Sequence, residues 1–151
     1  MREILFRGKR VDNGEWVEGF YCGKVNKTFF SPAEDSAQII DKDLWWHEVT
    51  SETVGQYTGL TDKNGKKIFE GDIVRATCTY NTGHGVRKET KSYTVKYHEK
   101  YCYFYLARWR NNLLFDGNWS YFVGDFEVIG NIHDNPELLE VHNVTENRDS
   151  M

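Results

Sequence analysis

The chain has few of the residues and segments that mark several large classes of protein. It contains only two prolines and three cysteines, and no apolar run approaches the roughly 18–20 residues that a membrane-spanning helix needs. The cysteines Cys22, Cys78 and Cys102 are an odd number without a close pair, which argues against a disulfide framework. No CxxC or HxxxH pair brings two zinc ligands together. We therefore expect no metal, no cofactor and no membrane association.

An excess of either charge is also missing. The 19 basic and 23 acidic side chains give a formal net charge of −4, which excludes a protein that is basic throughout. The apolar run at the N-terminus, Ile4–Phe6, is too short for the core of a signal peptide. The length of 151 residues fits a single ordinary domain, with at most a small appendage. The three cysteines without a close pair lead us to expect a reducing cytoplasm.

Aromatic residues, in contrast, are abundant. They make up 15% of the chain, which is enough apolar surface to bury a core and argues against disorder. Alternating patterns predict β-strands nearly everywhere. The predicted strands are 2–7, 15–21, 53–60, 68–78, 93–98, 101–109, 119–123 and 126–132, and residues 31–43 are predicted to be a loop around one short strand.

Turn and cap residues separate these strands. Asn13-Gly14 and Asn64-Gly65 predict tight turns, because Asn and Gly tolerate positive φ, and residues 81–85 predict a hairpin loop. Pro136, after Asn135 as a cap, predicts one helical turn at residues 134–140. Short strands with such turns predict a mainly β protein, either a small barrel or a sandwich.

Three stretches resemble the YopX family of phage and prophage proteins. They are the opening MREILFRG, the central GQYTGLTDKNGKKIFEGDIV at residues 55–74, and FEVIGNIHDNPELL at residues 126–139. The resemblance implies a phage or prophage protein in a bacterial cytoplasm, with an SH3-like β-barrel in its C-terminal part. The predicted organisation is an N-terminal β unit at 1–50, the barrel at 51–140 and a polar tail at 141–151. The family supplies no established activity and no catalytic residues.

The sequence contains no motif that is typical of a catalytic site. There is no G-x-S-x-G motif, and Asn81–Gly85 lacks the lysine and the following helix of a phosphate-binding loop. Cys78 and Cys102 lie in strand patterns that predict inward-facing thiols. Asp72, in a Gly-Asp turn, is predicted to cap backbone N–H groups, and Asn131 is predicted to do the same. We therefore expect a protein that is not an enzyme.

A basic block stands out in the middle of the chain. Residues 72–110 carry eight basic and three acidic side chains, whereas residues 111–151 carry one basic and eight acidic ones. Cations beside aromatic rings are typical of surfaces that bind single-stranded nucleic acid. The alternative is a solvated sheet face whose lysines prevent edge pairing. The candidate contacts with nucleic acid or another partner are Lys88, Lys91, Lys96, Arg108, Trp109 and Arg110.

Trp45 and Trp46 form a second candidate surface. Two neighbouring residues of a strand face opposite ways, so a one-sided core cannot bury both rings. Either one ring lines a partner interface, where tryptophan is enriched, or the pair packs against the N-terminal strands. The leading hypothesis is an accessory protein that binds an unidentified host or phage protein and forms homo-oligomers. The alternative is nucleic-acid binding through residues 87–110.

Overall fold

The computed structural model describes residues 1–24, 36–107 and 126–139, and in these ranges the protein is mainly β. None of the helical segments there is long and apolar enough to span a membrane. Apart from the 3-10 turn Ser51–Thr53, the elements are β1 (Phe6–Lys9), β2 (Trp16–Lys24), β3 (Ser36–Ile40), β4 (Trp46–Thr50), β5 (Gly55–Thr61), β6 (Lys67–Phe69), β7 (Asp72–Asn81), β8 (Val86–His98), β9 (Tyr103–Ala107) and β10 (Glu127–Asn131). Residues 137–139 are helical.

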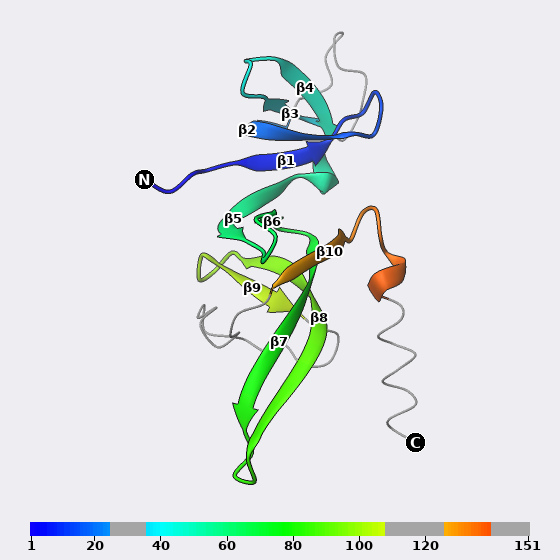
Figure 1. Cartoon of the computed structure of the whole chain (residues 1–151). Helices are drawn as coiled ribbons and strands as arrows, with labels where there is room; N and C mark the ends of the chain where they lie inside the picture. Colours follow the sequence, from blue (N-terminus) through cyan, green and yellow to red (C-terminus); the bar gives the residue numbers. More distant parts are fainter. Residues whose placement is uncertain (25–35, 108–125, 140–151) are drawn as a thin grey trace. The chain divides into compact units, whose positions relative to one another are not determined.

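These strands form antiparallel pairs in two sheets (Figure 1). One sheet has the order β4-β3-β2-β1-β5-β6, and the other has the order β10-β7-β8-β9. The chain divides into two compact units, Met1–Gly59 and Leu60–Met151. The mainly β class predicted from the sequence is confirmed, whereas the described strands form no closed barrel. The domain limits 1–50, 51–140 and 141–151 stay predictions.

The core of the N-terminal unit lies on one face of its sheet. Ala37, Ile39 and Val49 are fully buried, and Phe6, Val17 and Val54 pack against them. Gly19 allows β2 and β3 to approach, because a Cβ atom at this position would lie 2.0 Å from the carbonyl oxygen of Ile40. A single bridge between Arg10 and Val49 joins the segment after β1 to the edge strand β4.

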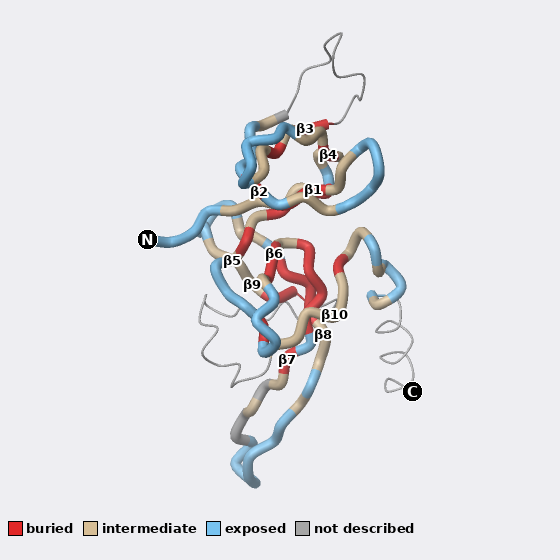
Figure 2. The backbone as a smooth tube through the Cα atoms, turned by 45° about the horizontal axis from the view of Figure 1, so that its top comes forward, coloured by how far each residue is buried: buried red, intermediate tan, exposed pale blue. Residues whose placement is uncertain are grey.

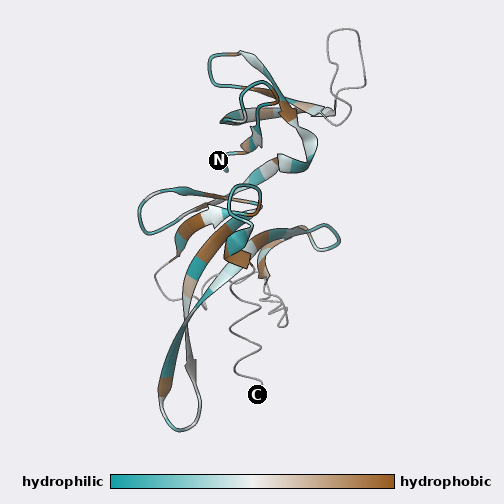
Figure 3. Cartoon of the chain, turned by 90° about the vertical axis from the view of Figure 1, so that its right-hand side faces the viewer, coloured by the Kyte–Doolittle hydropathy of each residue, from teal (hydrophilic) through white to brown (hydrophobic). Residues whose placement is uncertain are grey.

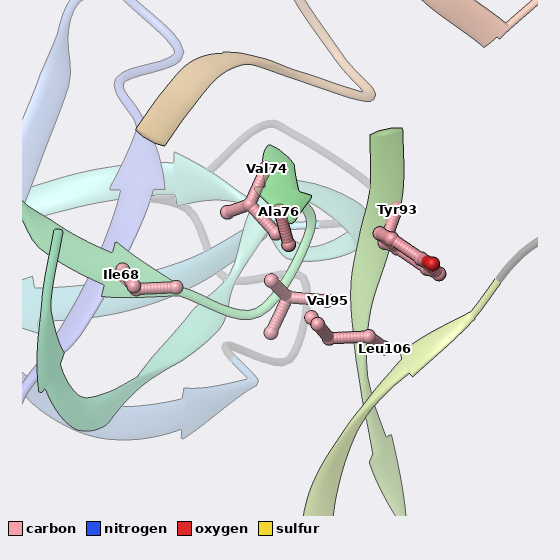
Figure 4. Packing of buried hydrophobic residues seen from close by; sticks show 6 residues of the cluster. All are labelled: Ile68, Val74, Ala76, Tyr93, Val95 and Leu106. Carbon is pink, nitrogen blue, oxygen red and sulfur yellow. The ribbon is translucent and has the colours of Figure 1, made fainter. Parts of the chain in front are cut away.

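The core of the C-terminal unit is built mainly by β6 to β9. Figure 4 shows Val95 and Leu106 beside Val74 and Ala76. Ile68 and Tyr93 complete the buried cluster, and Phe126 and Val128 pack against it. The register pairs Val74 with Tyr93 and Val95 with Leu106, so alternate residues of three strands face the same core.

The hairpin of β7 and β8 extends beyond this core. Residues 86–88 of β8 are exposed, and the buried residues of both strands lie at the opposite end of the hairpin (Figure 2). The distal part is coloured mostly as hydrophilic or neutral in Figure 3. The predicted loop at residues 81–85 is confirmed, with Thr82 N–H donating to the Gly85 carbonyl oxygen at 3.0 Å.

Four of the predicted turn and cap roles are confirmed. Gly14 and Gly65 have φ of 72° and 78°, as the Asn-Gly turns require. The buried Asp72 carboxylate accepts a hydrogen bond from the Phe69 N–H at 2.8 Å. Asn131 Oδ1 accepts from the N–H groups of His133 and Asp134 at 3.0 and 2.9 Å. Where the chain turns, the side-chain oxygens of Asp72 and Asn131 accept the hydrogen bonds that backbone carbonyl oxygens accept within strands.

Other local predictions were wrong or fall outside the described residues. The first strand begins at Phe6 and not at Arg2. Cys102 is exposed and has a φ of 55°, because it lies in the tight turn between β8 and β9 and not in a strand. Asn135 Oδ1 accepts the Asn131 N–H at 3.2 Å, so this side chain bonds the end of β10. The predicted strand 119–123 lies outside the described ranges.

Candidate nucleic-acid interface and partner surface

Strands β8 and β9 place lysine, histidine and tyrosine on one face of the C-terminal sheet. The register puts Lys96 opposite Tyr105 and His98 opposite Tyr103. Directly paired residues of antiparallel strands share a face. Val95 and Leu106 form the neighbouring pair and point into the core, so the Lys96 pair faces the other way. We name this surface the lysine–tyrosine face, consisting of Lys96, His98, Lys100, Tyr101, Tyr103 and Tyr105.

The rings on this face form a connected row. His98 lies 4.9 Å from Tyr101, 5.3 Å from Tyr103 and 6.0 Å from Tyr105, measured between ring centroids. The Tyr101 and Tyr103 rings are nearly parallel, with an 11° interplanar angle and centroids 6.3 Å apart. Tyr103 and Tyr105 meet edge to face at 6.2 Å. Tyr101 is the outermost ring and is 60% exposed. The row offers aromatic surface to a planar ligand.

Cations border the aromatic row. Lys96 is exposed, and the Nζ atom of Lys100 lies 5.1 Å from the centroid of the Tyr101 ring. Lys88 lies on the same face of β8 because it is an even number of residues from Lys96 in an uninterrupted register. Between them, Thr94 is buried with its partners Ile73 and Ala107 on the same side, and Thr90 and Thr77 share a 2.8 Å hydrogen bond between their hydroxyl groups.

Acidic groups on this face are concentrated at one place. Glu127 of β10 pairs with Arg75 of β7, and its carboxylate lies 3.8 Å from the Arg75 guanidinium and 3.4 Å from the Lys63 ammonium. One carboxylate between two cations leaves this part of the face without excess negative charge. Glu99 is the acidic residue closest in sequence to the tyrosines and lies exposed in the turn before Tyr101.

The candidate residues of the basic block do not all lie on one surface. Lys88 and Lys96 share the lysine–tyrosine side of β8, whereas Lys91 lies on the opposite side, with its ammonium 2.6 Å from the Glu89 carboxylate. Arg108, Trp109 and Arg110 lie outside the described residues. Tyr93 is buried in the core, and Tyr97 faces Phe104 with 5.0 Å between ring centroids. These two rings are therefore not part of the candidate interface.

Sequence reasoning did not single out His98, Lys100, Tyr101 or Tyr105 as contact residues. The alternation of Tyr101, Tyr103 and Tyr105 is visible in the sequence, but it does not tell which side of the strand faces the core. The pairing of Lys96 with Tyr105 decides this point. One signal was available in the sequence. Val95 and Leu106 are aliphatic and are predicted to face the core, so their immediate neighbours along each strand are predicted to face the other side.

The N-terminal unit presents the second candidate surface around the turn between β3 and β4. Trp45 and Trp46 are 70% and 61% exposed, and the preceding Leu44 is 74% exposed with a φ of 66°. The register places Phe20, Ile40 and Trp46 side by side across β2, β3 and β4. We name this surface the tryptophan face, consisting of Phe20, Ile40, Leu44, Trp45 and Trp46.

Asp41 organises the turn that carries these rings. Its Oδ1 atom accepts hydrogen bonds from the N–H groups of Asp43 and Trp45 at 2.9 and 3.0 Å. Its Oδ2 atom lies 2.7 Å from His47 Nε2. The hydrogen bond from His47, together with those from the Trp45 and Asp43 N–H groups, holds the pKa of the Asp41 carboxyl below its ordinary value. The turn is therefore held in place by one ionised side chain.

The expectation that the two tryptophans lie on one strand and face opposite ways was wrong. Strand β4 begins at Trp46, and Trp45 belongs to the turn held by Asp41. Both rings are therefore exposed. Partner contact by one ring and packing of the pair against the N-terminal strands both stay predictions, and the register places Trp46 beside Ile40 of β3.

The two surfaces differ in the side chains that they present. In the described ranges, no three His, Cys, Asp or Glu side chains come close enough to hold a metal ion. The two cysteines whose side chains are described, Cys22 and Cys102, are free thiols at the surface. Cations, aromatic rings and apolar side chains are what the two faces present to a ligand.

Comparison with known proteins identifies the family. The family model described as YopX protein matches residues 5–140. The chain belongs to the YopX family. Its YopX match includes β1 to β10 and thus both candidate surfaces. Among curated proteins, none matches the chain.

A solved structure is similar to this YopX protein. It is the crystal structure of protein EF1440 from Enterococcus faecalis, which is 24% identical, with a TM-score of 0.50. The similarity covers 92% of this chain and 99% of the other. At this identity the likeness concerns the fold alone. The central YopX signature contributes Asp62 and Asp72, whose carboxylates bond the backbone N–H groups of turns, so these two residues of the signature have structural roles.

Proposed function

We propose that this YopX protein binds single-stranded nucleic acid through the lysine–tyrosine face. The observation that carries the proposal is the register of β8 and β9, which puts Lys96 beside three tyrosines and a histidine on the side of the sheet away from the core. Rings accept bases by stacking, and lysines contact phosphates. A duplex hides the faces of its bases, so the row favours single strands.

The expected affinity follows from the number of such contacts. Base stacking on an aromatic side chain contributes roughly 1–3 kcal/mol per base, so loss of one ring weakens binding by about tenfold or more. Lys88, Lys96 and Lys100 are three candidate phosphate contacts. For single strands they give a slope of about −2 in a plot of log affinity against log salt concentration.

The test is fluorescence anisotropy with labelled oligothymidylate and oligouridylate over a series of salt concentrations. Tyr103→Ala is expected to weaken binding about tenfold, and Lys96→Gln to reduce both the affinity and the salt slope. Lys91→Gln is the matched control, because it removes the same charge from the opposite side of β8. Equal effects of the two lysine substitutions, or no binding even at low salt, would contradict the proposal.

A second candidate function is the binding of a protein partner through the tryptophan face. The observation that favours it is the exposure of Leu44, Trp45 and Trp46 on a turn that Asp41 holds in place. Exposed apolar patches mark interaction sites, and tryptophan is enriched at hot spots. Affinity capture from a bacterial lysate, with and without nuclease, tests it. A nuclease-resistant partner that Trp46→Ser loses supports it, and identical capture by both proteins contradicts it.

The biological setting is part of the same proposal. We place the protein in the cytoplasm of a bacterial host, encoded by a phage or prophage, and acting as a non-enzymatic accessory protein that forms homo-oligomers. The resemblance of the sequence to phage and prophage proteins supports this setting. A nucleotide or ester hydrolysis that a single substitution abolishes would overturn the non-enzymatic part.

The finer fold is also a proposal. We assign an SH3-like barrel to the C-terminal part of the chain, supported by the antiparallel order β10-β7-β8-β9 and the Gly-Asp turn that leads into β7. An experimental structure in which the strands of this unit close on themselves would establish it. An open sheet would refute it.

A further inference from the structure

We infer that the distal hairpin of β7 and β8 enters the major groove of double-stranded DNA. This inference goes beyond the single-strand binding proposed above, because it concerns another part of the C-terminal unit and another form of nucleic acid. We name this part the hairpin arm, consisting of residues 77–90. Its two strands pair without a shift from Thr77 opposite Thr90 to Asn81 opposite Val86.

The hairpin arm lies beyond the core of its unit. The buried cluster takes Val74 and Ala76 from β7 and Tyr93 and Val95 from β8, all of which lie outside the arm. Residues 86–88 of the arm are exposed, and Figures 1 and 2 show the hairpin extending away from the buried part of the two strands. Among the described residues, the core is therefore built without the arm, and core packing does not explain the arm's length.

The dimensions of the arm match one groove of one duplex. At roughly 3.3 Å per residue, residues 77–81 of β7 extend the arm by about 16 Å, more than the roughly 8.5 Å depth of the major groove of B-form DNA. This groove is about 12 Å wide and admits a two-stranded ribbon, whereas the minor groove is only about 6 Å wide. The major groove of A-form RNA is too narrow for side chains to read. The shape of the arm therefore selects duplex DNA over duplex RNA.

The arm carries cations on both of its faces. Arg87 and Lys88 are exposed and point to opposite faces, because they are neighbours on one strand. Glu89 is the only acidic residue in the sequence of the arm, and its carboxylate lies 2.6 Å from the Lys91 ammonium at the base. Phosphates line both walls of a DNA groove, so an inserted ribbon with a cation on each face meets phosphate on each side. The charge of the arm thus complements a polyanion that surrounds it.

The tip of the arm has a defined shape and a side chain suited to a base edge. The N–H and the hydroxyl of Thr82 both donate to the Gly85 carbonyl oxygen, at 3.0 and 3.1 Å. A turn that is ordered before binding loses less conformational entropy on binding. Val86, the first residue after the turn, is 68% exposed. Thymine presents its methyl group in the major groove, where apolar side chains contact it.

The experiment is an anisotropy titration of the full-length protein with blunt-ended DNA and RNA duplexes of one sequence, which offer no single strand. The DNA duplex is expected to bind at least about tenfold more tightly than the RNA duplex. Arg87→Gln is expected to weaken binding of the DNA duplex about threefold and to reduce the salt slope by about one. Arg2→Gln is the matched control, because it removes an exposed arginine from the N-terminal unit, and it is expected to change the affinity less than about twofold.

A shortened variant tests the arm as a whole. Replacement of residues 78–89 by Asn-Gly joins Thr77 to Thr90 through a two-residue turn and leaves the buried cluster intact. Circular dichroism and calorimetric unfolding establish that the variant is folded. We expect it to bind the DNA duplex at least about tenfold more weakly. Its affinity for oligothymidylate is expected to fall no more than about threefold, because the tyrosines stay in place and only Lys88 of the lysine–tyrosine side is removed.

Several outcomes would overturn the inference. They are equal binding of the DNA and RNA duplexes, full duplex binding by the shortened variant, and displacement of the protein by netropsin, which occupies the minor groove. Self-association that the shortened variant loses, without duplex binding, would identify a second copy of this chain as the partner of the arm. Failure of oligothymidylate binding alone would refute only the single-strand proposal, whereas failure of duplex binding alone would refute only the role of the arm.

Discussion

The carboxylate of Asp62 provides the sharpest test of how the C-terminal unit is held together. Its Oδ1 atom accepts the N–H groups of Asn64 and Lys66 at 2.8 and 2.9 Å, and its Oδ2 atom accepts the Val128 N–H at 3.0 Å. The side chain is 7% exposed. It thereby joins the turn before β6 to β10, which is 66 residues away along the chain. We predict that Asp62→Ala strongly destabilises this unit.

The magnitude follows from the three hydrogen bonds. Each hydrogen bond to a charged group contributes roughly 1.5–3 kcal/mol. Asn64 and Lys66 are exposed, however, so their N–H groups form hydrogen bonds with water after the substitution. We therefore expect a loss of about 3 kcal/mol in the free energy of unfolding. For a unit of this size the transition midpoint falls by roughly 12–20 °C. Asp62→Asn is expected to lose about half as much, because its amide oxygen still accepts the two N–H groups of the turn.

The pH dependence supplies an independent check. Burial alone would raise the pKa of the Asp62 carboxyl, but the N–H groups of Val128, Lys66 and Asn64 together outweigh it and hold the pKa below its ordinary value of 3.8. A carboxyl whose pKa is lowered on folding stabilises the protein above its unfolded-state pKa. This stabilisation is lost as the pH falls through the folded-state pKa. The difference between wild type and Asp62→Ala is therefore constant near neutral pH and shrinks below about pH 4.

Calorimetric unfolding of the wild type and both variants, between pH 2 and pH 7, measures these differences. Circular dichroism at low temperature confirms that each variant is folded before heating. An unchanged midpoint in Asp62→Ala at pH 7, or a difference that stays the same down to pH 2, would refute the assignment of Asp62 as an ionised backbone cap.

Further substitutions test the C-terminal core, the contact between β2 and β3, the turn at Gly65 and the turn that carries Trp45. Leu106→Ala removes a buried side chain of the C-terminal core and is expected to cost about 2–5 kcal/mol in chemical denaturation, whereas Tyr101→Ala, on the exposed turn, is expected to cost less than about 1 kcal/mol. Gly19→Ala places a Cβ atom 2.0 Å from the Ile40 carbonyl oxygen and is expected to abolish the cooperative unfolding of the N-terminal unit. Gly14→Ala meets no atom within 4 Å and is expected to keep cooperative unfolding, with a loss of about 1 kcal/mol from its φ of 72°. Gly65→Ala, at a φ of 78°, is expected to lower stability by about 1 kcal/mol in the same assay. Asp41→Ala releases the Trp45 N–H and is expected to lower the tryptophan fluorescence anisotropy, which Asp43→Ala leaves unchanged because the backbone N–H of Asp43, and not its carboxylate, bonds Asp41.

Local chemistry explains which parts of the fold were predictable. Asn64-Gly65 and the Gly-Asp pair at Asp72 are short-range signals, because the turn and its capping side chain lie within a few residues of each other. The alternation around Tyr93 and Val95 correctly predicted a half-buried strand. The bond between Asp62 and Val128 depends on chain closure over dozens of residues, and no local pattern specifies it.

The candidate surfaces were predictable only in part, for a related reason. Composition located the basic block, but a shift of one residue along a strand moves every side chain to the other face. This is why Lys91 and Tyr93 lie away from the interface while Lys96 and Tyr105 lie on it. The pairing of β7 with β8 continues without a shift from Ile73 to Asn81, and it determines which residues of β8 face the core.

The two surfaces differ in a way that bears on how the protein works. The lysine–tyrosine face carries exposed lysines and belongs to the C-terminal unit, whereas the tryptophan face is mainly apolar and belongs to the N-terminal unit. Cations attract a polyanion, whereas the burial of apolar side chains depends little on charge. The two proposed functions therefore predict different responses to salt: raising the salt concentration weakens nucleic-acid binding at the first face and leaves apolar binding at the second nearly unchanged.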